Sequence, residues 1–491
     1  MQLSQDKPRI VFLLSSASLL ILAIFSVGYN HPDEHFQILE FAALKLQLTK
    51  PENLPWEFHN MMRPTLQPAI VVLVHKIFAL FGCTSPFAIT VFLRILTGAL
   101  SFVSMRMIYR HYSKEFADPL LQKYFLFLSF LLWFALYNNV RYCSETWSAL
   151  FFIIGFSYLY CLSRKPLKAD FLITGLLLGL SFVFRYQAGF FIAGFLAWFA
   201  IVRKERLIHL VYMIAGILLI VIAGIITDRW FYGEWVLTTW NYFQQNIVAD
   251  KLSGFGILPW YFYFVDIFGR AMPPFSLVFM LSFLLFFIFR PKDLLTWTLL
   301  PFILIHFAIG HKESRFFFPL IGFIPVILIK SIELVRDKWY PALFGNKLFR
   351  FFVKFFAISN MMLIVITFFN PADSLVRLYQ VIYTKYNYPV TLYYLAEDPY
   401  HRALKVYYYK RDNLILKKAS SAVQLNADSI TKFLVASKTG NKTLDSIHNK
   451  RLIWSSHPEW IKLFDFYNWV ERTPFWNVYE VDRLKNSGSK D

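Results

Sequence analysis

The stretch IVFLLSSASLLILAIFSVGYNHPDEHFQILEFAALKL, residues 10–46, places two adjacent carboxylates directly after an apolar run. Residues 10–28 contain no charged side chain, and a run of about 20 apolar residues is long enough to cross a bilayer. Two basic residues precede the run and no small-residue cleavage site follows it, so we expect a retained membrane anchor. Beyond this anchor, Asp33 and Glu34 lie between two histidines.

The composition of the whole chain is typical of a multi-pass membrane protein. Of its 491 residues, 57% are hydrophobic and only 16% are charged, against about 25% charged residues in soluble globular proteins. The formal charge of +19 does not indicate a nucleic-acid partner, because the basic residues concentrate in short connections between apolar runs, as in cytoplasmic loops. The three cysteines show no metal-ligand spacing, and the sequence contains no Walker, Rossmann or zinc motif.

Keeping the basic connections on one side of the membrane predicts about eleven spans, with the N-terminus inside and the C-terminus outside. Residues 68–82 are too short for a span and contain a histidine and a lysine, so we expect an interfacial amphipathic helix there. The predicted spans cover residues 10–28, 87–109, 119–137, 144–162, 169–185, 186–202, 207–226, 272–289, 293–310, 315–333 and 350–369.

The composition changes after the last predicted span. Polar turns then alternate with the strand-like stretches VTLYYL (390–395), LKVYYY (404–409), KFLVAS (432–437) and WNVYEVDRL (476–484). We therefore predict an all-α membrane domain over residues 1–371, with large outer loops at 29–86 and 227–271, and a small α/β domain over residues 372–491 on the outer side.

Asp33 and Glu34 allow two interpretations. Acids beside a proline are typical of a helix N-terminus, where they favour the helix dipole. Alternatively, a carboxylate beside the apolar membrane surface has its pKa raised by desolvation, which suits a general base that accepts a proton from an alcohol. A metal site at His31, Asp33 and His35 is a weaker alternative, because this spacing matches no standard ligand set.

The stretch HKESR, residues 311–315, forms a very short outer turn rich in cations. Short translocated loops usually avoid Lys and Arg. Either Glu313 neutralises part of a snorkelling cluster, or His311, Lys312 and Arg315 form a clamp for a lipid phosphate. We favour the clamp.

The stretch TDRWFYGEW, residues 227–235, opens the second large outer loop. Its aromatic residues are typical of an interfacial belt, but planar aromatics with amide side chains also suit sugar recognition. Asp228 and Glu234 are either structural acids or contacts to an acceptor. Arg63 and Arg185 are further outer-face cations, each of which alone is more often an interfacial anchor.

Carboxylates, cations and aromatics thus gather on one predicted face, and this combination favours transfer of a group from a lipid phosphate. A transporter is a separate hypothesis. It predicts ionisable residues inside the spans, whereas the candidates here lie in loops.

Five motifs, in order, resemble the dolichyl-phosphate-mannose-dependent α-mannosyltransferases of glycosyltransferase family 22. Members of this family build glycosylphosphatidylinositol (GPI) anchors and lipid-linked oligosaccharides, and the likeness is greatest to the GPI branch. The motifs lie between residues 29 and 323 and read HPDEHFQILEFA, LPWEFHNMMRPTLQP, TDRWFYGEWVLTTWNYFQQNIV, LPWYFYF and HKESRFFFPLIGF.

This resemblance implies a GT-C membrane fold, a polyprenyl- or dolichyl-phosphate-mannose donor, a lipid-linked glycan acceptor and transfer with inversion. It implies Asp33 as the general base with Glu34 as its partner, and Lys312 and Arg315 as the groups that neutralise the leaving phosphate. Two cations can stabilise a single phosphate, so we expect no metal or other cofactor. The remaining candidates are His311, Arg63 and Arg185 for the phosphate, and Asp228, Trp230, Tyr232, Trp235 and Trp260 for the sugar and acceptor.

Two positions depart from the family pattern and leave the acceptor open. The family commonly has Arg-Ser where this chain has Arg63-Pro64, and Arg-Pro-Thr-Ala where it has Arg185-Tyr186-Gln187-Ala188. The alternatives are the same fold with another lipid-phosphate-linked sugar, such as glucose or arabinose, and a lipid or sugar transporter. With no obvious retrieval tail, we expect a bacterial inner membrane rather than the endoplasmic reticulum, with the site on the periplasmic face.

Overall fold

The computed structural model describes residues 6–421, 425, 430–439, 441–444, 446, 447, 449–457, 463, 465, 469–473 and 475–482. The chain divides into two compact units. The first consists of Met1–Ser26, Trp56–Cys83 and Ile89–Asn370, and the second of Val27–Pro55, Thr84–Ala88 and Pro371–Asp491. The predicted domain division kept the first outer loop with the membrane helices, whereas the structure groups residues 27–55 with the C-terminal part.

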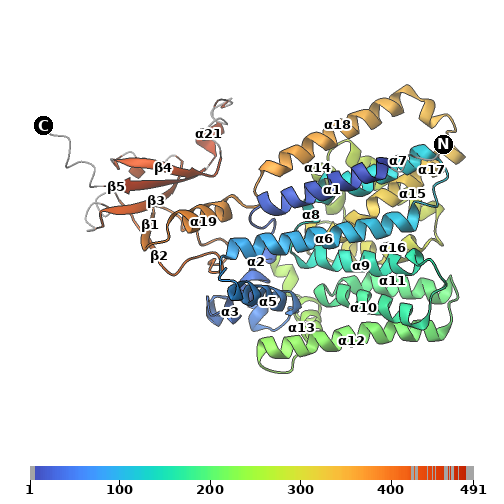
Figure 1. Ribbon diagram of the computed structural model, residues 1–491, viewed down its shortest axis with the longest axis horizontal. Coiled ribbons are helices and arrows are strands. Elements are labelled where there is room, and N and C mark those ends of the chain that lie inside the picture. Colours follow the sequence, from blue (N-terminus) through green and yellow to red (C-terminus); the bar gives the residue numbers. More distant parts are fainter. Residues whose placement is uncertain are drawn as a thin grey trace. The chain divides into compact units, whose positions relative to one another are not determined.

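The first unit is a bundle of long apolar helices with a core rich in phenylalanine (Figure 1). Within this core, Phe191 stacks on Phe302 with ring centroids 3.9 Å apart. Its helices are α1 (Asp6–Phe25), α4 (Trp56–His59), α5 (Leu66–Leu80), α6 (Pro86–Tyr112), α7 (Pro119–Leu131), α8 (Trp133–Asn138), α9 (Ser144–Cys161), α10 (Lys168–Phe184), α11 (Ala188–Ile201), α12 (Leu207–Tyr232), α13 (Thr238–Phe243), α14 (Phe262–Arg270), α15 (Phe275–Phe289), α16 (Leu294–Ala308), α17 (Ile324–Lys338) and α18 (Lys347–Phe369), with the shorter helical segments η2 (Gln244–Val248), η3 (Lys251–Phe255), η4 (Ser314–Phe323) and η5 (Leu343–Gly345).

Each of the eleven predicted spans corresponds to a helix or to a pair of consecutive helical segments. By length and apolar composition, six helices of the described residues can cross a membrane, or seven when α15 and α16, bent by 119°, count as one broken span. The other predicted spans are α9, α10 and α11, which have 18, 17 and 14 residues. Much of α9 and α10 is buried, so these two helices meet neighbouring protein more than lipid.

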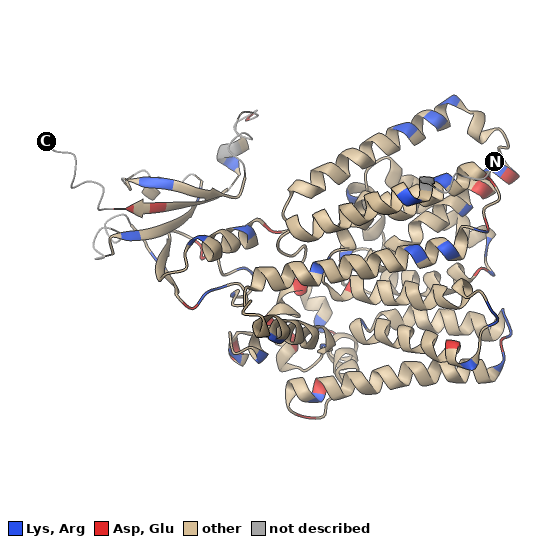
Figure 2. Cartoon of the chain, viewed as in Figure 1, with Lys and Arg blue, Asp and Glu red and all other residues tan. Residues whose placement is uncertain are grey.

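The basic connections lie together at one end of this bundle. Lys330 of α17 pairs with Glu115 at 2.7 Å and with Asp293 at 3.4 Å, and Arg336 of the same helix pairs with Asp118 at 2.7 Å. These contacts join the α6–α7 and α15–α16 connections to the end of α17, and Figure 2 shows Lys and Arg at this end. The α6–α7 and α15–α16 connections therefore lie at the same end of the bundle, and the predicted topology places both on one side of the membrane.

Helices α10 and α12 pack closely through glycines. Gly175 and Gly179 lie four residues apart on α10, and a Cβ atom at Gly175 would collide with the carbonyl oxygen of Met213 on α12. A Cβ atom at Gly216 of α12 would in turn collide with the carbonyl oxygen of Leu172. Such small-residue contacts let helix backbones approach closely in a membrane, where apolar burial alone gives little driving force.

The connection between α7 and α8 breaks the helix inside the apolar bundle. Asn360 of α18 satisfies two backbone groups at this break. Its Oδ1 accepts a hydrogen bond from the backbone N–H of Trp133 at 3.0 Å, and its Nδ2 donates to the carbonyl of Leu131 at 2.6 Å. Backbone groups at membrane depth need such protein partners. The buried asparagine therefore explains how the broken span is tolerated.

The second unit is built around a five-stranded sheet with strand order β2-β1-β3-β5-β4. β1 runs parallel to both β2 and β3, and β5 runs antiparallel to β3 and β4. The elements are α2 (Pro32–Phe36), α3 (Leu39–Lys45), η1 (Pro51–Asn53), α19 (Ser374–Lys385), β1 (Val390–Tyr394), β2 (Leu414–Lys418), β3 (Lys432–Lys438), η6 (Lys442–Leu444), β4 (Lys450–Ser455), α21 (Trp469–Arg472) and β5 (Trp476–Asp482).

Three of the four predicted strands coincide with β1, β3 and β5. The prediction of a strand over residues 404–409 is wrong, because this segment is irregular and the backbone N–H groups of Tyr407 and Tyr408 donate to the side chain of Glu40 instead of to a neighbouring strand. The prediction also missed β2 and β4. Both are rich in lysine, arginine or serine and show weak apolar alternation.

Candidate active site

The two adjacent carboxylates lie in the short helix α2 (Pro32–Phe36) of the second unit. His31 is the N-cap, and its Nδ1 accepts a hydrogen bond from the backbone N–H of Asp33 at 3.3 Å. Glu34 is buried and its Oε2 accepts the backbone N–H of Asn30 at 2.9 Å, whereas Asp33 is only partly buried. Both acids therefore lie at a helix N-terminus, as the first interpretation predicts, and Asp33 is the more accessible of the two.

The metal-site alternative at His31, Asp33 and His35 is not supported by the arrangement of these side chains. Among the described residues, no group of three or more His, Cys, Asp or Glu side chains is placed to hold a metal ion. The His35 ring is fully buried and its Nε2 hydrogen-bonds Glu40 Oε1 at 2.8 Å. His35 therefore belongs to a buried polar contact inside the second unit.

Residues 311–315 lie in the first unit, between α16 and α17, and form an ion-pair network. Arg315 donates from Nε and Nη2 to the two oxygens of Glu313, at 2.7 and 3.0 Å. His311 Nε2 lies 3.0 Å from the same carboxylate. Glu313 therefore neutralises part of this turn, as one of the two interpretations of HKESR predicts.

Glu145 at the start of α9 joins the same network from a distant part of the sequence. Its Oε1 lies 2.9 Å from Arg185 Nη1 and 3.2 Å from Arg315 Nη1, and all three side chains are buried. Both guanidinium groups also lie over the ring of Phe316, at 5.3 and 5.5 Å. The sequence analysis missed Glu145, although a single acid that opens an otherwise apolar run was a usable signal.

Lys312 differs from the arginines beside it. The side chain is buried and Nζ donates to the carbonyl of Ile309. None of the described carboxylates lies within ion-pair distance of this ammonium group, and burial lowers the pKa of Lys312 because desolvation disfavours the charged form. Lys312 is therefore a buried ammonium group that forms an ion pair with none of the described carboxylates.

A second polar group surrounds Asp228, near the C-terminal end of α12. Oδ1 accepts the backbone N–H of Thr65 at 2.9 Å and its hydroxyl at 2.7 Å, and Oδ2 accepts the hydroxyl of Thr238 at 2.7 Å. All three residues are buried. The carboxylate therefore ties α12 to the start of α5 and to α13, which favours the structural interpretation of this acid.

Replacement of Asp228 by alanine is expected to lower the free energy of unfolding by about 3 kcal/mol, because it leaves several buried donors without an acceptor. Thermal unfolding of the purified protein in detergent, followed by tryptophan fluorescence, measures the effect. Glu234→Ala removes an exposed acid from the same loop and is the matched control. Equal melting temperatures for the two variants would contradict the structural role.

Arg63 and Tyr232 contact each other near this group. The Tyr232 hydroxyl donates to the backbone carbonyl of Arg63 at 2.9 Å, and the Arg63 guanidinium pairs with Glu57 at 3.4 Å. The guanidinium also lies 5.6 Å from the centre of the Tyr242 ring, whose hydroxyl accepts a hydrogen bond from Gln187 at 2.5 Å. Arg63 thus has both an ionic and an aromatic partner within the first unit.

The connection between α10 and α11 joins the two polar groups. Arg185 at its start contacts Glu145, and the hydroxyls of Tyr186 and Thr238 lie 2.5 Å apart. These contacts, with the backbone of residues 185–187, connect six of the predicted residues of the first unit: His311, Arg315, Arg185, Arg63, Asp228 and Tyr232. Lys312 is next to His311 in the sequence, but its ammonium group contacts the carbonyl of Ile309. Asp33 and Glu34 belong to the second unit.

The predicted tryptophans lie in more open positions. Trp230, Trp235 and Trp260 are exposed. A largely apolar cavity of about 460 Å³ lies between α10, α12 and α13, and its lining includes Asp228 and Tyr186. None of the three tryptophans is among its lining residues, so their assignment to the sugar remains a prediction.

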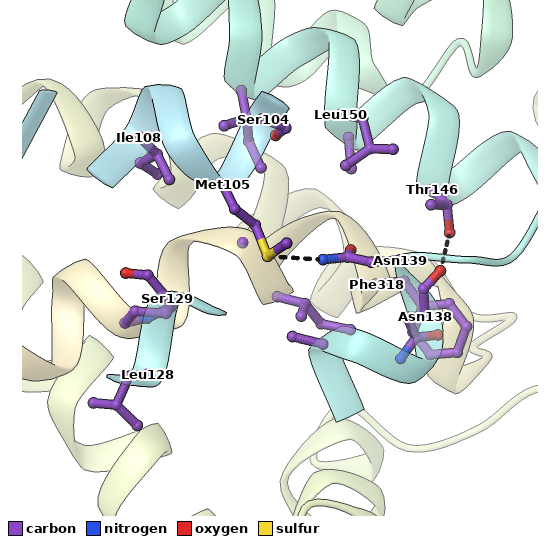
Figure 3. Close-up of a pocket in the computed structure, with 16 residues that line it drawn as sticks. Ser104, Met105, Ile108, Leu128, Ser129, Asn138, Asn139, Thr146, Leu150 and Phe318 are labelled. Atoms are coloured by element: carbon purple, nitrogen blue, oxygen red, sulfur yellow. Dashed lines mark hydrogen bonds between the residues drawn. The ribbon is translucent and has the colours of Figure 1, made fainter. Parts of the chain in front are cut away.

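A smaller cavity of about 30 Å³ lies deeper in the bundle, among α6, α7, α8, α9 and η4 (Figure 3). Thr146 donates from its hydroxyl to the carbonyl of Asn138 at 3.2 Å, and Asn139 Nδ2 lies 3.5 Å from Met105 Sδ. This volume suits about one water molecule. None of the predicted site residues lines it, so it is not a candidate substrate site.

Comparison of the sequence with models of protein families identifies the family to which the five motifs belong. The model of the Alg9-like mannosyltransferase family matches residues 10–396. The chain belongs to this family. The predicted resemblance is therefore confirmed, and the matched range includes all five motifs of this Alg9-like protein.

Two eukaryotic proteins are among the relatives of the Alg9-like chain. GPI alpha-1,2-mannosyltransferase 3 of Bos taurus is 26% identical over 348 residues, which are 68% of this chain and 59% of the relative. GPI mannosyltransferase 4 of Schizosaccharomyces pombe is 28% identical over 351 residues, which are 66% of this chain and 62% of the relative. The chain thus spans less than two thirds of the length of either relative.

The solved structure of ArnT from Cupriavidus metallidurans bound to undecaprenyl phosphate is similar in fold. The TM-score is 0.53 at 9% sequence identity, and the match covers 96% of this chain and 97% of ArnT. At this identity the likeness concerns the fold alone. It confirms the predicted GT-C architecture of the Alg9-like protein, an all-α multi-pass membrane protein with a small C-terminal sheet domain.

Proposed function

We propose that this Alg9-like protein transfers mannose from a polyprenyl- or dolichyl-phosphate-mannose donor to a hydroxyl of a lipid-linked glycan. The observation that carries the proposal is the buried ammonium group of Lys312, which pairs with none of the described carboxylates, in a chain of a mannosyltransferase family. A buried charge is unfavourable unless something compensates for it. The phosphate of a lipid-linked donor has the right charge to do so.

The proposed chemistry is a single displacement at C1 of mannose. The acceptor oxygen bonds to C1 while the bond from C1 to the phosphate oxygen breaks, and the electron pair of that bond leaves with the lipid phosphate. The acceptor hydroxyl gives its proton to a carboxylate. Because the new bond forms opposite the leaving group, a β-linked donor gives an α-linked product.

We assign the proton to Asp33 and the leaving phosphate to Lys312, with Arg315 and Arg185 as supporting cations. The exposure of Asp33 supports this assignment, since Glu34 is buried against the backbone of Asn30. Preorganised cations beside a leaving phosphate stabilise the charge that develops in the transition state. Two cations are enough for one phosphate, so the proposal needs no metal.

The active site is proposed to face the periplasm or the lumen. All the basic connections at one end of the bundle would then lie in the cytoplasm, as the positive-inside rule requires. The same orientation applies in a bacterial inner membrane and in the endoplasmic reticulum.

A transfer assay with three donors tests the function. The purified protein in nanodiscs is given a polyprenyl phosphate that carries labelled mannose, glucose or arabinose, together with a lipid extract as the acceptor source. We expect label from the mannose donor alone in the lipid-linked glycan, with an α linkage by NMR. Preferential transfer of glucose or arabinose would instead show a GT-C enzyme for another sugar.

The transporter hypothesis makes a different prediction for the same protein. In proteoliposomes, a flippase would move the labelled lipid between leaflets without forming a glycosidic bond. Lipid movement without transfer, in the presence of an acceptor pool that a known mannosyltransferase uses, would overturn the proposed function.

A further inference from the structure

Glu40 is a buried carboxylate that holds two distant parts of the second unit together. The residue is 2% exposed. Its Oε1 accepts the backbone N–H of Tyr407 at 2.8 Å and of Tyr408 at 3.0 Å, and the same oxygen lies 2.8 Å from His35 Nε2. One oxygen therefore contacts both the helical turn α2 and the segment 404–409.

Two tyrosine rings stack on the ring of His35. The ring of Tyr29 lies 5.0 Å away with an interplanar angle of 23°, and the ring of Tyr409 lies 5.5 Å away at 14°. Tyr409 itself stacks on Phe87 at 4.9 Å. His35 is the neighbour of Glu34 in the sequence, so these ring contacts limit how the turn with the two carboxylates can move.

The start of the first loop is fixed to the C-terminal part by a further set of contacts. The backbone N–H of Asp373 donates to the carbonyl of Val27 at 3.1 Å, and Arg402 pairs with the carboxylate of Asp373 at 3.2 Å. Gly28 has φ of +99°, and a Cβ atom there would collide with Asp373. The loop is thus held both before and after the two carboxylates.

We infer that Glu40 is a positioning residue for mannose transfer. Through its contacts with Glu40, segment 404–409 of the C-terminal part holds the turn that carries Asp33 and Glu34. The inference rests on the proposed function, in which Asp33 accepts the acceptor proton. It assigns the C-terminal part a role in placing the base.

The strength of these contacts supports a positioning role. Hydrogen bonds from N–H groups to a carboxylate are about twice as strong as those between neutral groups. A displacement of about 1 Å in a reacting group reduces the rate by about 100-fold. Loss of the Glu40 contacts therefore affects the catalytic step more than the binding of a lipid donor.

Two substitutions at Glu40 and one control test this inference. Glu40→Ala removes the acceptor oxygen, and Glu40→Gln keeps an oxygen for the two N–H groups but removes the charge. Glu397→Ala is the control, since Glu397 is an exposed acid of the same unit that pairs with Lys438 at 2.7 Å. The measurements are kcat and KM for the mannose donor per folded protein, and hydrogen exchange of residues 29–37 and 404–409.

We expect Glu40→Ala to lower kcat about 100-fold, with KM for the donor changed less than about threefold. Glu40→Gln should recover about a tenth of wild-type kcat, because it keeps the acceptor oxygen but loses the charge. Hydrogen exchange should increase in both segments of Glu40→Ala and in neither segment of the control.

Unchanged kcat in folded Glu40→Ala, while Asp33→Asn is inactive, would overturn the inference and leave the proposed function intact. If Glu40→Ala does not fold, wild-type kcat in Glu40→Gln with wild-type exchange has the same meaning. Absence of mannose transfer by wild type would instead overturn the proposed function, and the exchange measurement would still report whether Glu40 holds the two segments together.

Discussion

Replacement of Asp33 by asparagine is expected to lower kcat for mannose transfer by about 1,000-fold, because asparagine cannot accept the proton of the acceptor hydroxyl. The side chain keeps its size and its place in α2, so KM for the donor should change little. The assay follows labelled mannose from the lipid donor into the lipid-linked glycan. Glu52→Gln, an exposed acid of the same loop, is the matched control and should be fully active.

Glu34→Gln separates the two neighbouring carboxylates. Glu34 is buried with its Oε2 on the N–H of Asn30, so we expect a smaller loss than in Asp33→Asn. Full activity of Asp33→Asn combined with an inactive Glu34→Gln would reverse the assignment and make Glu34 the base.

Replacement of Lys312 by methionine is expected to lower kcat/KM for the donor by about 100-fold to 1,000-fold, as for the loss of one group that stabilises transition-state charge. Methionine has similar length, so the buried packing is kept. Lys165→Met changes an exposed lysine in the α9–α10 connection and should be neutral. Equal donor kinetics in Lys312→Met and wild type would remove Lys312 from the donor site.

The same substitution should leave the fold at least as stable as wild type, since it removes a charge that burial destabilises. The lowered pKa of Lys312 fixes the sign of the pH dependence. Burial of the charged ammonium group lowers the free energy of unfolding, and this effect has its full size at pH values below the pKa of Lys312 in the folded protein. It disappears as the pH rises above the ordinary lysine value of 10.5. The stability difference between Lys312→Met and wild type is therefore largest at pH values below the folded pKa of Lys312.

Helix positions could be predicted from the sequence because hydropathy and basic connections are local signals. All eleven apolar runs are helices, and the connections that contain Glu115, Asp293 and Arg336 lie together as predicted. The break between α7 and α8 could not be predicted, because its repair depends on Asn360, more than 200 residues later. A single polar residue in an apolar run gives no indication of which backbone groups its side chain hydrogen-bonds.

The candidate site was predictable in its residue types but not in its partners. Lys312, Arg315 and Arg185 follow from cations in short outer turns, and the structure brings Arg315 and Arg185 to the same carboxylate, that of Glu145. Glu145 was missed because one acid in an apolar helix looks like an ordinary N-terminal residue. The alternation in LKVYYY suggested a strand. Two of its backbone N–H groups instead donate to the carboxylate of Glu40. No local sequence pattern indicates an acceptor so distant in the sequence.

The contact between Glu40 and Tyr408 also sets an order of events during synthesis. Its two residues are 368 positions apart in the sequence. At about 5 to 20 residues per second, the turn with the two acids is made about 20 to 70 s before the backbone that fixes it. Until Tyr408 has been made, a chain attached to the ribosome therefore carries both acids in an incomplete unit.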